Sequence, residues 1–505
     1  MFKKVLIANR GEIAVRVMRT CRDMGVQSVA VYSEADATAL HARYADEAYC
    51  IGPAPAAQSY LDGAKIIETA LACGAKAIHP GYGFLSEQAD FATACAEAGI
   101  VFIGPSPHAL RVLGDKVQAR LIAERAGAPS VPGSDGRVTP SEALALAPSI
   151  GYPLLIKAAA GGGGKGIRLV EDEGAFEASL RMAAAEALAS FNDDGLYIER
   201  YLYPVRHIEV QVLADRFGNV VHLGERECSI QRRSQKLVEE SPSAAVSPEQ
   251  RAGLGAAAVA IAREAGYENA GTVEFLLDKH GDFYFIEANA RLQVEHPVTE
   301  LVTGLDLVRE QLRIAAGEPL GFAQEDVAIR GSAIECRITA EDATAGFMPS
   351  LGVVGHVSEP SGPGVRVDSS LFEGMEVGPH YDSLVSKLVV WGADRTQALA
   401  RLRRALDEYQ VLGVKTTLPF HRALADDPNF IAGSIHTRYL DTWDAPAAGA
   451  AVSPDEALVI AALLSHERRG GGTANAGSAP RSGWKTAGRE GAVNRYGGSS
   501  WRNTF

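Results

Sequence analysis

The sequence predicts an α/β protein whose N-terminal part holds a mostly parallel sheet and whose C-terminal part is α+β. In the N-terminal region, short apolar runs typical of buried strands alternate with amphipathic helical patterns. After about Gly331 the chain changes to short β-like pieces separated by Gly and Pro turns, followed by a helical pattern near residues 397–408. A length of 505 residues exceeds what one core can organise and indicates about three domains.

The elements of the N-terminal region follow from the local pattern. We expect an amphipathic helix at residues 12–23 and strands at residues 4–8, 28–32, 77–79 and 101–103. This βαβ alternation places neighbouring strands parallel.

A second unit starts near Gly114, and a Pro-Gly joint lies at residues 129–133. Short strands at residues 154–157 and 167–170 bracket a run of glycines.

The end of the chain has a different composition. Residues 445–453 form an Ala-Pro-rich linker, and residues 454–469 are a candidate helix. Residues 470–505 are rich in Gly, Ser, Ala and Arg and poor in aliphatic side chains, which predicts disorder in isolation.

Composition indicates an ordinary globular protein, with 47% hydrophobic and 22% charged residues. The net charge of −13 argues against a nucleic-acid-binding protein, whose surface is normally basic. Six scattered cysteines without a C-x-x-C pair indicate reduced thiols, not a disulfide or zinc framework. Since no apolar run approaches membrane-spanning length, we expect no membrane association and a cytoplasmic location.

The most informative stretch is a predicted hairpin of residues 273–277 and 283–286, joined by the turn-forming residues 279–282. If the turn is centred between His280 and Gly281, Glu274 faces Glu287 directly. Asn289, two residues further on, points to the same face.

Two acidic side chains that face each other destabilise a sheet, so the pairing of Glu274 with Glu287 requires an explanation. Divalent cations such as Mg²⁺ between Glu274, Glu287 and Asn289 would supply one, and they usually accompany nucleotide phosphates. The alternative is a solvated face with incidental acids. On this register Leu276 and Phe285 share the face of the acids, which argues against full solvent exposure.

A glycine run lies between the two short strands and comprises Gly161, Gly162, Gly163, Gly164, Lys165 and Gly166. A strand follows it instead of a helix, so it is not a dinucleotide fingerprint. Neither Ser nor Thr follows Lys165, so it is not a Walker loop. Two interpretations stay open: a flap whose N–H groups close over phosphates, or a flexible surface turn.

Two lysines and one acid are further candidates for a nucleotide site. Lys157 ends an apolar strand, which suits a cation directed into a cleft, and Lys116 begins the second unit. Residues 198–202 form a strand-to-loop stretch, with Glu199, of the kind that can hold an adenine edge and ribose. Taken singly, each lysine is more readily explained as a surface charge.

The order of these features resembles the ATP-grasp superfamily and, within it, biotin carboxylase. The resemblance covers about residues 1–446 and rests on residues 7–14 (IANRGEIA), 79–87 (HPGYGFLSE), 114–116 (GDK), 231–236 (QRRSQK), 291–299 (RLQVEHPVT) and 335–338 (ECRI). It implies a Rossmann-like N-terminal domain at 1–113, an ATP-grasp domain at 114–330 with a mobile glycine-rich lid at about 131–203, a C-terminal domain at 331–446, and a linker, short helix and flexible tail at 447–505.

The resemblance also implies roles for individual residues. Mg²⁺ or Mn²⁺ would be held by Glu274, Glu287 and Asn289. ATP would be bound by the glycine run together with Lys116, Lys157, Glu199, His207, Gln231 and Leu276. Bicarbonate would lie against Lys236, Arg291, Gln293 and the Val294 backbone. Glu295 would take the bicarbonate proton, and Arg337 would stabilise the enolate oxygen of biotin.

Three residues in two regions depart from the family pattern. Ala160 and Lys165 stand in a glycine flap that is usually longer in glycine and often contains an arginine. Ser234 stands where the family usually has a histidine near the nucleotide. The chain therefore lacks that imidazole, whereas phosphate binding by the flap does not depend on the departures.

The resemblance implies partners as well. No Met-Lys dipeptide of the biotinylation type occurs in the sequence, so we expect biotin on a separate biotin carboxyl carrier protein. The leading hypothesis is that the chain is the biotin carboxylase component of an acetyl-CoA or other acyl-CoA carboxylase in fatty acid biosynthesis. We expect it to form a homodimer and to act together with carboxyltransferase subunits. The alternatives are the front part of a propionyl-CoA, methylcrotonyl-CoA or pyruvate carboxylase chain, and an ATP-binding pseudoenzyme. A dehydrogenase is disfavoured because residues 9–12 lack the glycine spacing.

Overall fold

Five parallel strands form the N-terminal sheet, in the order β3-β2-β1-β4-β5. They are β1 (Lys4–Ile7), β2 (Gln27–Ser33), β3 (Glu47–Gly52), β4 (Ala77–His79) and β5 (Val101–Phe102). The predicted strands and the helix α1 (Gly11–Asp23) are confirmed within one residue. Strand β1 is the apolar centre of the sheet, since Val5, Leu6 and Ile7 are completely buried.

The helices of this region are short, and most start with a clear cap. They are α2 (Leu40–Tyr44), α3 (Gly63–Cys73), α4 (Ala89–Glu97), α5 (Pro107–Gly114) and α6 (Lys116–Arg125). Asp62, Ser106 and Asp115 accept hydrogen bonds from the first turns of α3, α5 and α6. The cap at Asp115 fixes the position of Lys116, the first residue of α6.

A small three-stranded antiparallel sheet forms a separate layer beyond α6, in the order β7-β6-β8. It contains β6 (Leu154–Ala158), β7 (Ile167–Val170) and β8 (Leu196–Arg200), and two helices pack on it, α7 (Pro140–Ile150) and α8 (Glu173–Phe191). The backbone at Gly133 lies against β8, where a Cβ would stand 2.5 Å from the Ile198 carbonyl oxygen. The predicted Pro-Gly joint is thus a close backbone approach that requires glycine.

The central sheet has eight strands, in the order β13-β12-β9-β10-β11-β14-β21-β19. They are β9 (Val205–Ala214), β10 (Val220–Arg232), β11 (Gln235–Ser241), β12 (Asn269–Asp278), β13 (Phe283–Asn289), β14 (Ser332–Thr339), β19 (Val365–Ser369) and β21 (Leu384–Gly392). The C-terminal α+β region is confirmed, but its three longest strands extend the central sheet. Sequence periodicity could not show this, because pairing between distant strands leaves no local pattern.

Helices α9 (Pro248–Glu264) and α11 (Leu307–Ala315) contact the strands of the central part of the chain, whereas α10 (His296–Thr303) contacts β14, β10, β11 and β21. Helix α12 (Arg395–Glu408) packs on β14 and β21, with α13 (Leu418–Ala425) and α14 (Pro428–Ala432) beside it. Three two-stranded ribbons complete this part: β15 (Glu341–Asp342) with β16 (Met348–Pro349), β17 (Gly352–Val353) with β20 (Glu376–Val377), and β18 (His356–Ser358) with β22 (Gln410–Leu412).

The acid-bearing hairpin β12–β13 confirms the facing of Glu274 and Glu287 but not the whole predicted register. Near the turn, Phe275 pairs with Phe285 and Leu276 with Tyr284, one residue away from the predicted pairing. A β-bulge at Ile286 restores the register at the acids. Leu276 shares the face of Glu274, as predicted, because β12 is regular here and Leu276 pairs with His207. The prediction that Phe285 also shares this face is wrong, since Phe285 packs with Phe275 in the core.

The turn itself explains the shift. The Asp278 side chain accepts hydrogen bonds from the backbone N–H groups of His280 and Asp282, and Gly281 adopts a φ of 91°. Next to the turn, the paired residues of the two strands are therefore symmetric about residue 280. The prediction had placed the centre between residues 280 and 281. Turn chemistry thus sets the local register, and the bulge then corrects it.

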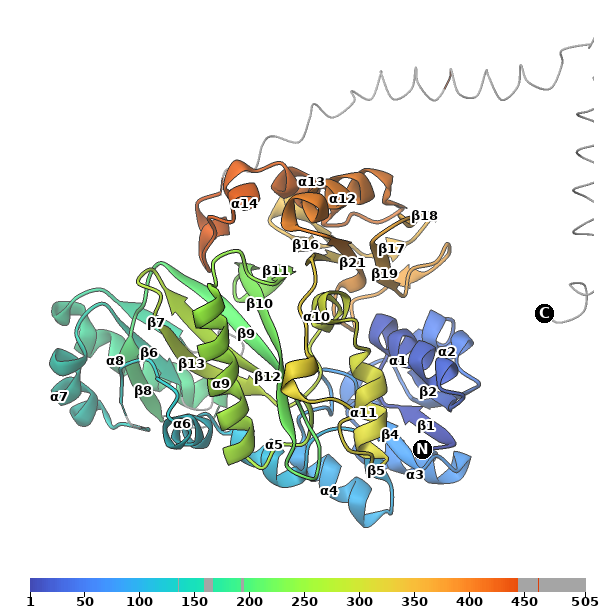
Figure 1. Cartoon of the computed structure of the whole chain (residues 1–505), viewed down its shortest axis with the longest axis horizontal. Coiled ribbons are helices and arrows are strands. Elements are labelled where there is room, and N and C mark those ends of the chain that lie inside the picture. The colour runs from blue at the N-terminus through green and yellow to red at the C-terminus, as the bar shows by residue number, and fades with distance from the viewer. Residues whose placement is uncertain (135, 159–166, 192–194, 444–461, 463–505) are drawn as a thin grey trace, which may run out of the picture. The chain divides into compact units, whose positions relative to one another are not determined.

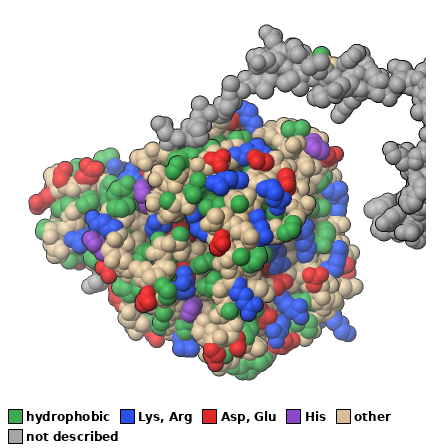
Figure 2. All heavy atoms as spheres, turned by 45° about the horizontal axis from the view of Figure 1, so that its top comes forward, with side chains coloured by type: hydrophobic (Ala, Val, Ile, Leu, Met, Phe, Trp, Pro, Cys, Tyr) green, Lys and Arg blue, Asp and Glu red, His purple; other side chains and the backbone are tan. Residues whose placement is uncertain are grey.

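The computed structural model describes residues 1–134, 136–158, 167–191, 195–443 and 462. The predicted glycine run, with Ala160 and Lys165, and the predicted helix and tail beyond residue 443 lie outside these residues, apart from Ala462. Within the described part of the chain, no helix combines the length and apolarity needed to cross a membrane. On the face shown in Figure 2, basic and acidic side chains are interspersed.

Candidate functional site

One large cavity, of about 850 Å³, is lined by residues of the N-terminal region, the small sheet β7-β6-β8 and the central sheet. It is lined by Asn9 and Tyr82 of the N-terminal part, by β6 and β8, by the central sheet, and by residues 380–384 before and in β21. Most of the candidate residues meet here: Lys116, Lys157, Glu199, His207, Gln231, Lys236, Glu274, Glu287, Asn289, Arg291, Gln293, Val294, Glu295 and Arg337. Leu276 does not line the cavity, and Gly161 to Gly164 are not among the described residues.

The facing acids differ in charge balance. Burial opposes ionisation of Glu274, but Lys236 and His207 hold its pKa well below the usual range. The Lys236 Nζ atom lies 3.1 Å from Glu274 Oε1, and the His207 Nε2 atom lies 2.9 Å from Oε2. Hence the expectation that only a metal offsets the acid repulsion is wrong for Glu274.

Glu287 is the acid that lacks compensation. Burial raises its pKa, the facing Glu274 raises it further, and Lys116 only partly opposes this. Carboxylates and an amide oxygen are the ligands that Mg²⁺ prefers, and the Asn289 side chain lies beside Glu274, to which its Nδ2 atom donates at 2.8 Å. Glu287 with a raised pKa behaves as an anion short of its counter-cation, so these residues fit a divalent cation.

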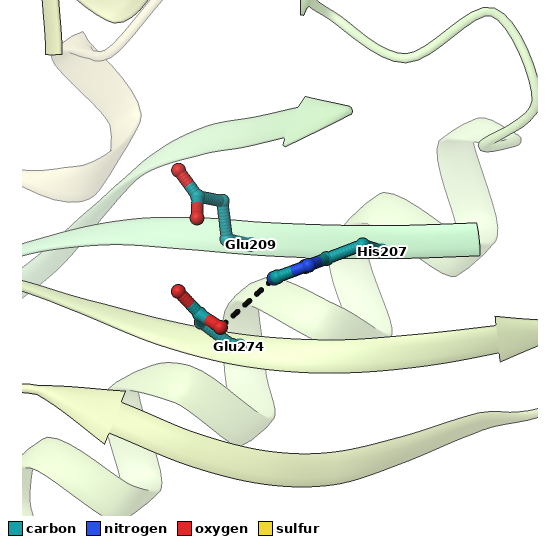
Figure 3. A group of neighbouring side chains, drawn as sticks. All are labelled: His207, Glu209 and Glu274. Carbon is teal, nitrogen blue, oxygen red and sulfur yellow. Dashed lines mark ion pairs between the residues drawn. The ribbon is translucent and has the colours of Figure 1, made fainter. Parts of the chain in front are cut away.

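A second group of possible metal ligands surrounds Lys236. Figure 3 shows His207 pointing from its strand toward Glu274 on the next, with Glu209 on the strand of His207, and ligand atoms of the three lie within 4.8 Å of one another. However, the Lys236 ammonium contacts Glu209 at 2.5 Å as well as Glu274. Lys236 and Arg226 already compensate the two carboxylates of this group, so we do not assign a metal to His207 and Glu209.

Glu209 and Glu295 also lie near Cys228. Burial keeps the pKa of the Cys228 thiol well above its usual value, so it is a neutral thiol and a poor metal ligand. Cys228 is therefore a small buried side chain to which we assign no chemical role.

Glu295 is held between two cations. Its Oε1 atom lies 2.6 Å from Lys236 Nζ, and its Oε2 atom lies 2.9 Å from Arg337 Nη2. Burial would raise the pKa of Glu295, but the two cations outweigh burial and keep it well below the usual range. Glu295 is the residue before α10, yet its side chain makes no capping hydrogen bond, so it does not act as a helix cap.

Arg291 is fixed by the loop that carries it. Its Nε atom donates to Glu87 Oε2 at 2.9 Å, and Nη1 donates to Gln293 Oε1 at 3.0 Å. Gln293 in turn donates to Glu274 at 3.1 Å. The 291–295 loop therefore reaches the acid pair on one side and the Lys236–Glu295 pair on the other.

Arg337 is anchored from behind by Glu239, whose carboxylate lies 2.5 Å away. Burial opposes the charge of Arg337, but Glu239 and Glu295 outweigh it and raise its pKa above the usual value, so it stays a cation. A buried guanidinium with two carboxylate partners is a rigid donor directed at the cavity.

The far side of the cavity holds the lysines. Lys157 on β6 pairs with Glu199 on β8, and both line the cavity. Burial lowers the pKa of Lys116, although Glu287 opposes this shift. An anionic ligand beside Lys116 would favour the charged form of this lysine.

Gln231 and Lys236 face each other across the β10–β11 hairpin. Ser234 lies in the turn between these strands, is exposed, has a φ of 64°, and lines the cavity. The departure from the family pattern is thus at the cavity wall.

Three residues of the site were missed by the sequence analysis: Glu87, Glu209 and Glu239. Glu87 ends a motif that supports the family resemblance, and Glu209 follows His207 by two residues on one strand, so strand alternation points both the same way. Those signals could have found two of them. Glu239 meets Arg337 only through the pairing of β11 with β14, which the sequence does not reveal.

Comparison with known proteins agrees with this geometry. Family models match residues 1–110 (biotin carboxylase, N-terminal domain), 115–323 (carbamoyl-phosphate synthase L chain, ATP binding domain) and 335–442 (biotin carboxylase C-terminal domain). A biotin carboxylase of Nostoc is 52% identical over 440 residues, which are 87% of this chain and 98% of that protein. The chain belongs to the biotin carboxylase family.

Other relatives carry different names. A pyruvate carboxylase subunit of Methanothermobacter thermautotrophicus is 53% identical over 444 residues, 88% of this chain and 90% of that protein. Biotin carboxylase 1 of Bacillus subtilis is 51% identical over 446 residues, 88% and 99% of the two chains.

Solved structures match the fold closely. The biotin carboxylase of Campylobacter jejuni, in a β-γ-ATP complex, has a TM-score of 0.85 at 48% identity and covers 88% of this chain and 99% of that one. The biotin carboxylase domain dimer of Hydrogenobacter thermophilus 2-oxoglutarate carboxylase, in complex with MgADP, ADP and bicarbonate, has a TM-score of 0.84 at 50% identity and covers 87% and 97%. This biotin carboxylase therefore has the three-domain architecture with an ATP-grasp domain, and it is an ATP-dependent ligase.

Proposed function

We propose that this protein uses ATP and bicarbonate to carboxylate biotin carried on a separate carrier protein. The observation that carries the proposal is an ionised Glu295 held between Lys236 and Arg337, in the same cavity as the acid pair Glu274–Glu287. This arrangement supports the proposal, because a carboxylate that could accept a proton, cations that could hold an anion and an acid pair that could hold a metal line one cavity.

The cavity divides into three binding regions. Glu274, Glu287 and Asn289 would hold Mg²⁺ or Mn²⁺, which would neutralise nucleotide phosphates. Lys116, Lys157, Glu199, His207 and Gln231, with the glycine run Gly161 to Gly164, would hold ATP. Leu276 on β12 pairs with His207 on β9. Its contact with adenine stays a prediction. Lys236, Arg291, Gln293 and the Val294 backbone would bind bicarbonate.

The chemistry follows from these positions. Glu295 removes the bicarbonate proton, and the resulting oxyanion attacks the γ-phosphate to give carboxyphosphate and ADP. Carboxyphosphate breaks down to CO₂ and phosphate, and the phosphate takes the N1′ proton of biotin. Arg337 stabilises the enolate oxygen while N1′ attacks CO₂. A bicarbonate anion that draws Lys236 and Arg337 toward itself would also raise the pKa of Glu295 and so increase its basicity.

Bicarbonate-dependent ADP release, with and without free biotin, tests the proposal. We expect ADP release to require bicarbonate and to rise when biotin is added. ATP binding without any turnover would instead indicate the pseudoenzyme.

We propose an acetyl-CoA or other acyl-CoA carboxylase as the complex in which the protein acts, with a biotin carboxyl carrier protein and carboxyltransferase subunits. The Methanothermobacter relative, named as part of a pyruvate carboxylase, supports a pyruvate carboxylase as the second candidate. Co-purification followed by an assay with acetyl-CoA, propionyl-CoA and pyruvate decides between them. The dimeric relative supports a homodimer. We also propose the domain limits 1–113, 114–330 and 331–446, and a cytoplasmic location.

Restoring the family histidine at position 234 should improve nucleotide binding modestly. A neutral hydrogen bond contributes about 0.5–1.5 kcal/mol, so Ser234→His should lower the KM for ATP by roughly two- to ten-fold with little change in kcat. The left-handed backbone at this position tolerates histidine. Steady-state kinetics at saturating bicarbonate measure both constants.

A fall in kcat would place Ser234 in the chemistry, contrary to this prediction. An unchanged KM would mean that position 234 does not contact the nucleotide.

A further inference from the structure

Both peptide groups that flank Val294 are held by hydrogen bonds. On one side, the Gln293 carbonyl lies 2.8 Å from His296 Nδ1. On the other side, the Val294 carbonyl accepts a hydrogen bond of 2.8 Å from the Nζ atom of Lys387. The orientation of the Val294 backbone is therefore fixed from both ends.

Lys387 lies on β21, and its side chain is completely buried. Its Nζ atom lies 3.3 Å from Glu12 Oε2, and Glu12 is itself buried at the start of α1. The Tyr82 hydroxyl donates to the other oxygen of Glu12. Tyr82, Glu12, Lys387 and the Val294 carbonyl thus form one buried chain from the N-terminal part to the 291–295 loop.

The cost of this arrangement argues for a purpose. Lys387 faces Arg337 across the β14–β21 pair, and two like charges side by side destabilise a sheet. Asp368, opposite Lys387 on β19, compensates part of this, together with Glu12. A neutral residue at position 387 would avoid the repulsion from Arg337, but it could not make a charge-assisted hydrogen bond to the Val294 carbonyl.

We propose that Lys387 is a positioning residue that, anchored by Glu12, fixes the Val294 peptide for bicarbonate. The inference rests on the proposed assignment of the 291–295 loop to bicarbonate. Without the Lys387 contact, the Val294–Glu295 peptide can rotate, and the Val294 backbone no longer meets the anion in one fixed orientation. The nucleotide-binding residues lie on other strands and keep their positions.

The test compares Lys387→Met with a matched control, Lys4→Met. Lys4 also contacts one carboxylate and one backbone carbonyl, those of Glu47 and Cys73, but it does not line the cavity. We expect Lys387→Met to raise the KM for bicarbonate about ten-fold or more, with the KM for ATP changed less than about two-fold. Lys4→Met should leave both constants unchanged.

A second readout is independent of turnover. Bicarbonate should raise the Tm of the wild-type protein in the presence of Mg²⁺ and a non-hydrolysable ATP analogue, and this shift should shrink in Lys387→Met. Because Lys387→Met leaves Glu12 without its cation, the double variant Glu12→Gln/Lys387→Met, which removes both charges, is measured in parallel. It should show the same rise in the bicarbonate KM.

The inference is overturned if a folded variant keeps the wild-type bicarbonate KM, if the KM values for ATP and bicarbonate rise together, or if neither variant folds, which would make Lys387 a stability residue. Failure of the proposed function looks different, because the wild-type protein itself would then show no bicarbonate-dependent ADP release.

Discussion

Glu287→Gln should reduce Mg²⁺-ATP turnover by at least about 100-fold while the protein remains folded. The substitution removes one negative charge from the site proposed to hold the metal. Glu274 cannot replace it, because its charge is already balanced by Lys236 and His207. ADP release at rising Mg²⁺ concentrations measures the effect.

Stability should move in the opposite direction from activity. The folded protein raises the pKa of Glu287, so at neutral pH an ionised Glu287 opposes folding. The neutral amide removes this penalty, and without metal the Tm of Glu287→Gln should equal or exceed that of the wild type. A loss of activity accompanied by a large fall in Tm would contradict this explanation.

Glu268→Gln is the matched control. Burial also raises the pKa of Glu268, which lies just before β12, the strand paired with that of Glu287, but does not line the cavity. We expect its activity to stay near that of the wild type. Normal turnover of Glu287→Gln at saturating Mg²⁺ would exclude the metal assignment.

Arg291→Ala and Arg337→Ala should differ in kind. Arg291 organises the loop proposed to bind bicarbonate through Glu87 and Gln293, so its removal should reduce bicarbonate-dependent ATP cleavage and biotin carboxylation together. Arg337→Ala should mainly reduce carboxyl transfer, by about 100-fold, and leave a larger fraction of uncoupled ATP hydrolysis. The ratio of carboxybiotin formed to ADP released separates the two.

The structure adds one refinement. Arg337 also contacts Glu295, so Arg337→Ala should slow ATP cleavage to some extent, but Lys236 still holds the other Glu295 oxygen. Arg251→Ala is the control, because Arg251 forms a two-point ion pair with Glu225 away from the cavity. Equal losses in both assays for Arg291→Ala and Arg337→Ala would contradict the division of roles.

Much of the site was visible in the sequence because its residues are close together along the chain. Glu274, Glu287 and Asn289 belong to one hairpin, and the 291–295 loop follows directly. Strand alternation is a local rule, and it placed Glu274 and Leu276 on one face correctly. Turn chemistry failed at Phe285, because it could not predict the bulge at Ile286 that brings Glu287 opposite Glu274.

The sequence by itself determined the βαβ order of the N-terminal sheet, the acid hairpin and the family motifs, since each is a pattern of near neighbours. Only the tertiary structure decided how charge is balanced. It placed Lys236 among Glu209, Glu274 and Glu295, Glu239 behind Arg337, and Lys387 between Glu12 and the Val294 carbonyl. These contacts join residues far apart in the chain, and the pKa of a buried group depends on all charges around it in space, which no stretch of sequence contains.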